Sequence, residues 1–371
     1  MILVRDKIKV LITDDSALMR KLISAMLSQD AEIEVVATAM DGILALKKIE
    51  QYQPDVITLD IIMPNMDGLT TLEHIVSRYH LPVIIVSSLV SPGAEITLRA
   101  LELGAVDFVA KPKNLVPDQI NIIAQELVAK IKAVANYRSR KVLNLCDKQI
   151  DKETNKEEKP LFEKKLTEIV KSEEKAAKLI CIGISTGGPE ALSWLLPKLP
   201  KNLAAAVLIV QHMPEGFTAQ LAQRLNKLSA IPIKEAADGD LILASRVLIA
   251  PGGRQMYVKK RPLAATVVVS EAPPVSGHCP SVDVLFASAA TEYGDNAIGV
   301  IMTGMGEDGV IGLGKIKQAG GLTLAQDEAS CVVFGMPKVA LAKGYVDEVV
   351  SLEKIPDYLV EKVGVYACDR K

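Results

Sequence analysis

Short apolar runs alternate with amphipathic stretches along most of the first 135 residues. The run "KIKVLITDD" (7–15) is typical of a buried strand, and 17–29 repeats apolar positions every three or four residues, which is typical of a helix. Further strands are predicted at 33–40, 55–60, 81–87 and 105–109, and further helices at 42–52, 68–79, 93–103 and 118–135. Strand–helix pairs joined by short connections predict a parallel sheet covered by helices on both faces.

The same alternation returns at residue 179. Strands are predicted at 179–184, 204–210, 298–303 and 322–327, and helices at 189–198, 216–228 and 309–318. Residues 240–285 are richer in glycine and proline and predict an added β hairpin with loops. We therefore expect an α/β protein of two domains, each a doubly wound, mainly parallel sheet.

The segment 136–178 between these regions differs in character. Its stretch "DKQIDKETNKEEKP" is densely charged, with both signs and few apolar residues, which is typical of a solvated linker. Its last part, from 161, spaces apolar residues loosely like a short helix. The expected organisation is a first domain at 1–135, a linker at 136–178 and a second domain at 179–368.

Composition excludes several classes of protein. The chain of 371 residues has 24% charged residues, 4% aromatic residues and a formal net charge of -2, so neither a basic surface nor a stacking platform for nucleic acid is expected. The five cysteines lie far apart and form no metal-binding spacing, which is typical of reduced thiols. No uncharged apolar run reaches the roughly 18 residues of a membrane span, and the charged start is unlike a signal peptide. We expect a cytoplasmic protein that does not insert into a membrane.

Polar side chains in the first domain follow successive predicted strands. Asp14 and Asp15 end the first strand, Asp60 ends the third, Ser87 the fourth, and Lys111 follows the fifth. The carboxyl ends of parallel strands share one edge, so these groups should lie together. Each acid alone could be an ordinary solvated side chain, but three converging carboxylates favour Mg²⁺, and Lys111 adds a positive charge for an anion.

Four segments then resemble the receiver domain of response regulators: "TDDSALMR", "LDIIMPNMDGL", "VIIVSS" and "GAVDFVAKP". The resemblance covers 7–135 and implies the strand order 2-1-3-4-5, a cis Lys111–Pro112 bond, and a sensor histidine kinase as phosphodonor. It also implies roles for single residues: Asp60 as the phosphate acceptor, Asp14, Asp15 and the carbonyl of Ile62 as further Mg²⁺ ligands, Ser87 and Lys111 as the phosphate-sensing pair, and Phe108 as the switch aromatic. Ile62 stands where many such receivers carry glutamate.

In the second domain, "ICIGISTGGPEAL" (180–192) allows two interpretations. "STGG" could hold a phosphate with backbone amides, but the segment has neither the lysine of a Walker A loop nor the dinucleotide spacing GxGxxG. A simple anion site at the helix N-terminus stays open. The spacing GxSxG at 183–187 instead predicts that Ser185 is a nucleophile on a tight, strained strand-to-helix turn.

A nucleophilic serine needs a base and an acid. His212 ends a predicted strand at the same sheet edge as Ser185, whereas His278, the other histidine of this half, lies in a loop. Glu307 and Asp308 follow another strand end, and we prefer Asp308 because its shorter side chain suits a fixed bond to an imidazole. The alternative is that Asp308 only caps the following helix. Amides near Thr186 and in the turn "GMG" could stabilise an oxyanion.

Five segments of this half resemble the effector domain of the chemotaxis protein-glutamate methylesterase (CheB) family: "IGISTGGPEAL", "VQHMPEGFTAQLAQRL", "LIAPGGRQM", "GHCPSVDVLFASAA" and "MTGMGEDG". The resemblance implies a triad of Ser185, His212 and Asp308, with the Met305 amide as an oxyanion donor. It implies hydrolysis of glutamate γ-methyl esters on chemoreceptors with release of methanol, and deamidation of receptor glutamines. Two features depart from the family: Gln255 stands where histidine is frequent, which predicts altered substrate contacts, and the linker is long and charged.

Two other functions stay open at this stage. One is a response regulator whose second domain only binds DNA or a partner, although its glycine-rich strand ends do not suit a helix-turn-helix. The other is an inactive scaffold that keeps an intact triad.

Overall fold

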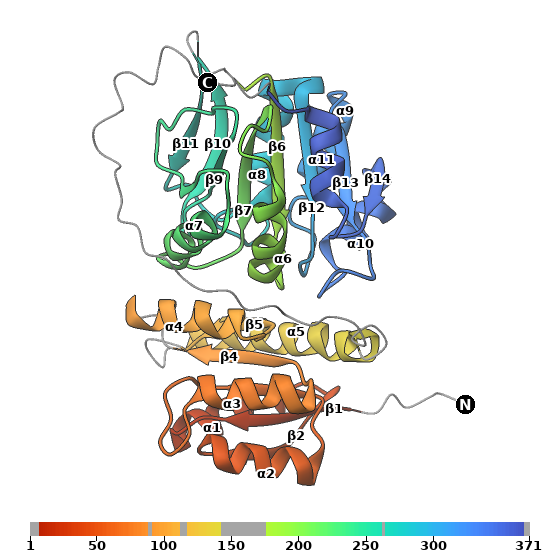
Figure 1. Ribbon diagram of the computed structural model, residues 1–371. Coiled ribbons are helices and arrows are strands. Elements are labelled where there is room, and N and C mark those ends of the chain that lie inside the picture. The colour runs from red at the N-terminus through yellow and green to blue at the C-terminus, as the bar shows by residue number, and fades with distance from the viewer. Residues whose placement is uncertain (1–6, 88–90, 112–116, 142–175, 262–263, 367–371) are drawn as a thin grey trace.

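The chain folds into two α/β domains, which Figure 1 shows one above the other. The structure is a computed structural model and describes residues 7–87, 91–111, 117–141, 176–261 and 264–366. The predicted helix from 161 and the Lys111–Pro112 bond lie outside the described residues. We refer to 7–141 as the N-terminal domain and to 176–366 as the C-terminal domain.

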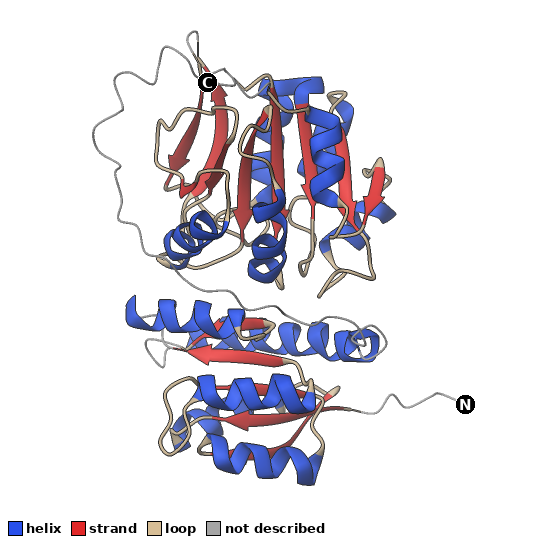
Figure 2. Ribbon diagram, viewed as in Figure 1, coloured by secondary structure: helices blue, strands red, loops and turns tan. Residues whose placement is uncertain are grey.

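The N-terminal domain has one five-stranded parallel sheet in the order β2-β1-β3-β4-β5, as predicted. Helices cover both of its faces (Figure 2). Its elements are β1 (Ile8–Thr13), α1 (Ala17–Leu27), β2 (Ile33–Ala39), α2 (Gly42–Tyr52), β3 (Val56–Leu59), α3 (Gly68–His74) with a π-helical end (Ile75–Tyr79), β4 (Val83–Ser87), α4 (Ser91–Glu102), β5 (Asp107–Ala110) and α5 (Pro117–Lys141). The α5 helix continues past the predicted end at residue 135.

The C-terminal domain has a seven-stranded parallel sheet in the order β14-β13-β12-β6-β7-β9-β8. Its strands are β6 (Lys178–Ile184), β7 (Ala205–Gln211), β8 (Ile233–Glu235), β9 (Arg246–Ile249), β12 (Ala297–Ile301), β13 (Leu322–Gln326) and β14 (Glu348–Val350). Its helices are α6 (Gly188–Leu195), α7 (Phe217–Leu228), α8 (Val282–Tyr293), α9 (Val310–Gln318), α10 (Met336–Ala342) and α11 (Ile355–Val363), with 3₁₀ turns at Leu196–Lys198 and Gly294–Asn296.

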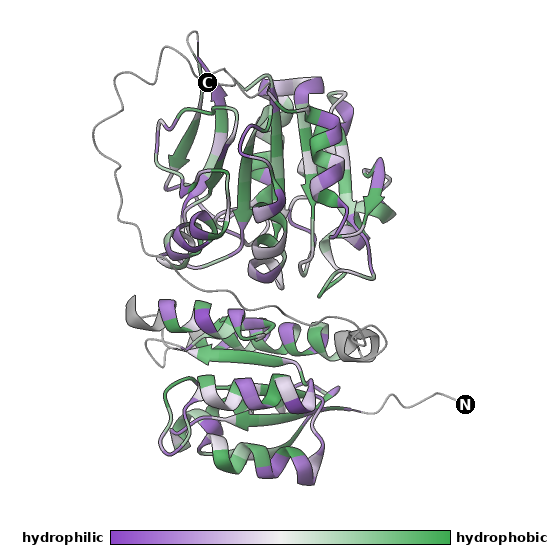
Figure 3. Ribbon diagram, in the orientation of Figure 1, coloured by the Kyte–Doolittle hydropathy of each residue, from purple (hydrophilic) through white to green (hydrophobic). Residues whose placement is uncertain are grey.

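The predicted hairpin is present as β10 (Gln255–Lys260) paired antiparallel with β11 (Ala265–Ser270). The apolar segment "RVLI", which lies in the region predicted as hairpin and loops, forms β9 instead and belongs to the main sheet. Strands buried on both faces need apolar residues throughout, and β7 is buried at every position. Figure 3 shows the hydrophobic residues gathered on the strands and the polar ones on the outer helix surfaces.

In each sheet the strand order reverses at the first strand of the domain, and in the C-terminal sheet it reverses once more at the edge, where β9 lies between β7 and β8. In the N-terminal domain β1 lies between β2 and β3, and in the C-terminal domain β6 lies between β12 and β7. In open α/β sheets ligands bind outside the carboxyl ends of the strands at such a reversal. The segments after β1 and β3 carry Asp14 and Asp60, and those after β6 and β12 carry Ser185 and Asp308.

Candidate active site

Ser185 follows the last residue of β6 in a turn that its neighbours define closely. Its carbonyl accepts hydrogen bonds from the Gly188 amide (2.8 Å) and the Gln211 Nε2 (3.0 Å), while its own amide donates to the Thr303 carbonyl (3.0 Å). The left-handed residue of the turn is Gly187, with a φ of 78°. Ser185 itself is not among the residues with positive φ, so the left-handed conformation falls on one of the glycines that flank the serine in the GxSxG spacing. Glycine takes up that conformation instead.

His212 comes directly after β7 and is held at the same edge of the sheet. Its amide donates to the Ile184 carbonyl (3.2 Å), beside Ser185. Its ring Nε2 lies 2.7 Å from the Asp308 Oδ2, and the buried Nδ1 has no hydrogen-bond partner in the described part of the chain. The structure therefore joins His212 to Asp308 and leaves Nδ1 as the ring nitrogen available to take a proton.

Asp308 is buried, with 1% of its surface exposed. Burial favours the neutral acid, but hydrogen bonds from His212, Ser281 and the Val282 amide outweigh it and lower the pKa of Asp308 below its ordinary value. The alternative that Asp308 caps its own following helix is wrong, because Gly309 is the N-cap of α9 and no side chain caps that helix. The carboxylate is thus kept ionised for a partner on another strand.

Sequence reasoning missed the position of His278. Its ring stacks on the ring of His212, with centroids 3.8 Å apart and planes 1° from parallel. Burial and the neighbouring His212 lower the pKa of His278 to about 4, so it is neutral near pH 7. His278 lies 66 residues from His212 along the chain, and no local pattern marks a loop histidine as its neighbour.

Gln255 also differs from expectation. We expected it to alter substrate contacts, but it is 1% exposed and does not line the cavity over Ser185. Its amide nitrogen donates to the carbonyls of Pro273 (3.3 Å) and His278 (3.1 Å), and its oxygen accepts from the Ser281 amide (2.8 Å). Gln255 therefore fastens the loop that carries His278.

A cavity of about 540 Å³ lies over Ser185 and His212, and both domains line it. Thr186 and Met305 also line it, and neither of their amides donates to another residue in the part of the chain that the structure describes. From the N-terminal domain, Phe108 of β5 and Glu126 and Lys130 of α5 form the opposite wall. The arrangement provides a hydroxyl, an imidazole with a bonded carboxylate, and free N–H groups around one space.

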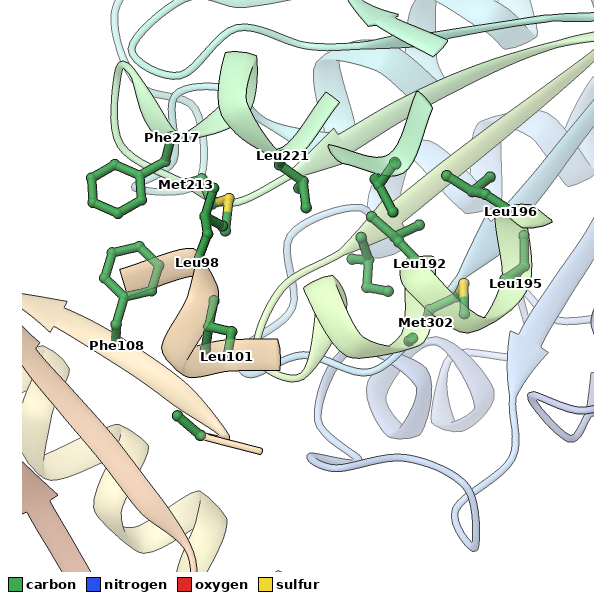
Figure 4. Close-up of a cluster of buried hydrophobic side chains, with 14 of the residues drawn as sticks. Leu98, Leu101, Phe108, Leu192, Leu195, Leu196, Met213, Phe217, Leu221 and Met302 are labelled. Atoms are coloured by element: carbon green, nitrogen blue, oxygen red, sulfur yellow. The ribbon is translucent and has the colours of Figure 1, made fainter. Parts of the chain in front are cut away.

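Apolar and charged contacts hold the two domains together beside this cavity. The rings of Phe108 and Phe217 stack with centroids 4.8 Å apart, within the cluster of buried side chains shown in Figure 4. Arg224 of α7 pairs with Glu102 of α4 at 2.7 Å and approaches the Leu98 carbonyl at 3.5 Å. In this conformation the N-terminal domain covers the serine.

The carboxylates of the N-terminal domain meet as predicted. Asp14, Asp15 and Asp60 each offer an oxygen within 4.8 Å of the others. Lys111 Nζ lies 2.7 Å from Asp14 and 2.6 Å from Asp60. Burial, with the charge of Asp14 adding to it, raises the pKa of Asp60. Closely spaced carboxylate oxygens that repel one another fit a hard divalent cation.

The other residues of this domain for which we predicted a role are Ser87, Ile62 and Phe108. Ser87 is buried, and its carbonyl accepts the Lys111 amide at 2.8 Å. The Ile62 side chain is 69% exposed. Phe108, the predicted switch aromatic, is buried against the other domain, and its carbonyl accepts from Lys130 Nζ at 2.6 Å.

The geometry defines a class of protein, namely a receiver-like domain with a cluster of carboxylates that fits a metal ion, joined to an α/β domain with a serine–histidine–aspartate constellation. Residues 10–120 match the response regulator receiver domain, and residues 180–359 match CheB methylesterase. The chain is 51% identical to the protein-glutamate methylesterase/protein-glutamine glutaminase 2 of Koribacter versatilis over 95% of each chain. It is 44% identical to the corresponding protein of Symbiobacterium thermophilum, over 97% of this chain and 98% of that one.

A solved structure, the CheB methylesterase catalytic domain of Thermotoga maritima, is 42% identical and covers 50% of this chain and 98% of its own, with a TM-score of 0.49. Because these relatives match the chain over nearly its full length, the chain belongs to the CheB methylesterase family. Among its described helices, none is long and apolar enough to cross a membrane.

Proposed function

We propose that this protein is a phosphorylation-controlled protein-glutamate methylesterase. It hydrolyses γ-methyl esters of glutamates on chemoreceptors, releases methanol, and so adapts chemotaxis signalling. The observation that carries the proposal is the 2.7 Å bond between His212 and Asp308 beside Ser185, in a cavity with free backbone amides. That combination suits acyl transfer to a serine.

In the first half of the reaction, the Ser185 oxygen attacks the ester carbonyl while His212 Nδ1 accepts the hydroxyl proton. Asp308 stabilises the resulting imidazolium through Nε2. The amides of Thr186 and Met305 stabilise the oxyanion, a contribution of roughly 3–4 kcal/mol per donor in other hydrolases. The C–O bond to the leaving group then breaks, His212 returns the proton, and methanol departs from the acyl-serine.

Water completes the cycle. It gives a proton to His212 and its oxygen attacks the acyl carbon, after which Ser185 leaves with that proton and the receptor keeps a free carboxylate. The same steps with a glutamine side chain release ammonia instead of methanol, because His212 can protonate a departing amine as well as an alkoxide. This accounts for a glutaminase activity at the same site.

Control resides in the N-terminal domain. Asp60 is the proposed phosphate acceptor, and Asp14, Asp15, Asp60 and the Ile62 carbonyl would hold Mg²⁺, which neutralises charge during phosphoryl transfer. Ser87 and Lys111 would bind the phosphoryl group. Since Phe108 stacks on Phe217, a change at β4–β5 reaches the contact that covers Ser185.

The partners follow from these two chemistries. A receiver domain takes its phosphoryl group from a kinase, and we propose a sensor histidine kinase. A methylesterase acts on a methylated receptor, and we propose the cytoplasmic domains of chemoreceptors, with both reactions in the cytoplasm. A DNA-binding output domain gains no support from the fold, because the C-terminal domain is built on a seven-stranded parallel sheet.

The test is methanol release from methylated receptor membranes, with and without a phosphodonor and Mg²⁺. We expect the phosphodonor to raise the rate, Ser185→Ala to abolish release in both conditions, and Asp60→Asn to keep the basal rate but lose the stimulation. Full activity in Ser185→Ala would falsify the mechanism. Undiminished stimulation in Asp60→Asn would contradict the regulation alone.

A further inference from the structure

The carboxylate of Asp308 has more partners than the orientation of one histidine requires. Its Oδ2 accepts from His212 Nε2 and from the Val282 amide, both at 2.7 Å. Its Oδ1 accepts from the Ser281 hydroxyl at 2.7 Å and from the Asp283 amide at 3.2 Å. All partners other than His212 belong to the start of α8.

Ser281 uses its side chain in an unusual way for its position. It is the N-cap of α8, where a serine hydroxyl commonly accepts an N–H of the first helical turn. Here the Ser281 side chain caps nothing in its own helix and is fully buried. The hydroxyl donates to Asp308 instead, and the Asp308 carboxylate accepts the helix N–H groups in its place.

The surrounding chain holds Ser281 in this position. Its amide donates to the buried side chain of Gln255. The next residue, Val282, lies where Gly183 and Gly309 have no side chain: a Cβ on either glycine would come within 2.4 Å of Val282. These two glycines allow the start of α8 to lie directly beside the strand ends that carry Ser185 and Asp308.

We propose that Ser281 is a positioning residue of the methylesterase reaction, which holds the Asp308 carboxylate in the rotamer and ionised state that His212 requires. This inference rests on the proposed function, because it takes Ser185, His212 and Asp308 as the reacting chain. A hydrogen bond to an ionised group is among the stronger ones in proteins. Its loss loosens the carboxylate just where the imidazolium forms.

The test compares Ser281→Ala with the wild-type full chain. We expect kcat for methanol release to fall roughly 10- to 100-fold while KM for the methylated receptor stays unchanged, because Ser281 does not line the cavity. Ser281→Thr keeps a hydroxyl and should recover most of kcat. If Ser281→Thr were as slow as Ser281→Ala, the hydroxyl group would not be what the reaction needs at position 281.

The pH profile separates this role from a merely structural one. The Ser281 bond is one of the causes that lower the pKa of Asp308, so its removal should raise that pKa. Activity without phosphodonor should then fail at higher pH on acidification than in the wild type. The other titratable groups facing Asp308 are His212 after β7, His278 behind it and Asp283 of α8, and Ser281 donates to none of them.

Ser288→Ala is the matched control. Ser288 lies on the same helix, and its hydroxyl donates to the Leu285 carbonyl and accepts the Val258 amide, away from Asp308. The Ser288→Ala variant should lower the stability of the domain without changing the pH at which activity is lost on acidification, which we call the acidic limb of the pH profile. Fluorescence of the single tryptophan, Trp194 in α6, reports the folding of this domain for each variant.

Two results overturn the inference: a Ser281→Ala enzyme with wild-type kcat, or one whose loss comes without a shift of the acidic limb. Ser185→Ala is assayed alongside. If methanol release from the wild type does not depend on Ser185, the proposed function fails. If it does and Ser281→Ala behaves as wild type, only the positioning role fails.

Discussion

Gly304 lies directly beneath the side chain of Ser185. A Cβ at position 304 would stand 2.8 Å from the Ser185 Cβ and 2.4 Å from the Met336 sulfur. The Gly304 amide also donates to the Val333 carbonyl, so the backbone cannot easily retreat. Ser185 therefore occupies its place only because residue 304 lacks a side chain.

We predict that Gly304→Ala lowers kcat by roughly 100-fold, since a displacement of about 1 Å at a reacting group can cost that much. The measurement is methanol release with phosphodonor. Gly299→Ala is the control: a Cβ there meets only the tips of Leu313 and Ile316, 2.7 and 2.9 Å away. It should cost stability but leave kcat near wild type, and equal losses in both variants would show that crowding in general is responsible.

At the scale of the element, the contact between α4 and α7 carries the closed arrangement. Arg224 and Glu102 join the helices across the domain boundary, and Phe217, which stacks on Phe108, lies on the same helix as Arg224. Their side chains are 23% and 40% exposed, and ion pairs of that kind contribute about 0.2–1 kcal/mol. A small contribution is enough to shift a balance between a covered and an open serine.

We predict that Arg224→Ala raises methanol release without phosphodonor by about 1.4- to 5-fold, the ratio that corresponds to such an ion pair. Glu102→Ala should do the same, and the double variant should not exceed either one. Lys317→Ala provides the comparison, because Lys317 also pairs with an acid, Asp347, and reaches a carbonyl, but entirely within the C-terminal domain. If Lys317→Ala also raised methanol release without phosphodonor, loss of the contact between the domains would not be the cause of the increase.

The elements themselves were largely predictable from the sequence. Buried parallel strands need uninterrupted apolar runs, so β6 and β7 were predicted close to their observed bounds. The segment "RVLI" was not assigned to the main sheet, because a run of three apolar residues fits a hairpin strand as well as a short parallel one. The length of α5 was missed because its last turns carry the charged residues expected of a linker.

The candidate site was predictable where its groups follow strand ends. Ser185, His212 and Asp308 share one sheet edge by topology, so their proximity could be expected. The partners that come from loops or from another domain could not. His278 reaches His212 through a loop that Gln255 fastens, and Arg224 meets Glu102 only because the two domains dock. No periodicity in the chain encodes contacts of that kind.

At the scale of the whole molecule, the carboxylate cluster and the serine site belong to different sheets. Three carboxylates gather after β1 and β3, whereas the serine and its partners lie after β6, β7 and β12. The Phe108–Phe217 contact joins the two domains that carry them. Loss of one site should therefore leave the chemistry of the other intact.

We predict that a chelator abolishes stimulation by the phosphodonor and leaves the basal rate of methanol release unchanged. Added Mg²⁺ should restore the stimulation. Asp60→Asn should show no response to chelator or metal, which makes it the control. A basal rate that falls on chelation would mean that the ester chemistry itself depends on a metal.

Asp308 also completes the first turn of α8, and this has a consequence for the history of the family. Polar groups at active sites usually reduce stability, so their replacement is often favourable once activity is no longer needed. Replacing Asp308 would instead leave the buried amides of Val282 and Asp283 without the acceptor to which they donate. A descendant that lost the reaction would be free to change Ser185 and His212, yet selection for folding alone would preserve the acid. In such a lineage, Asp308 would be a sign of ancestry and not of activity.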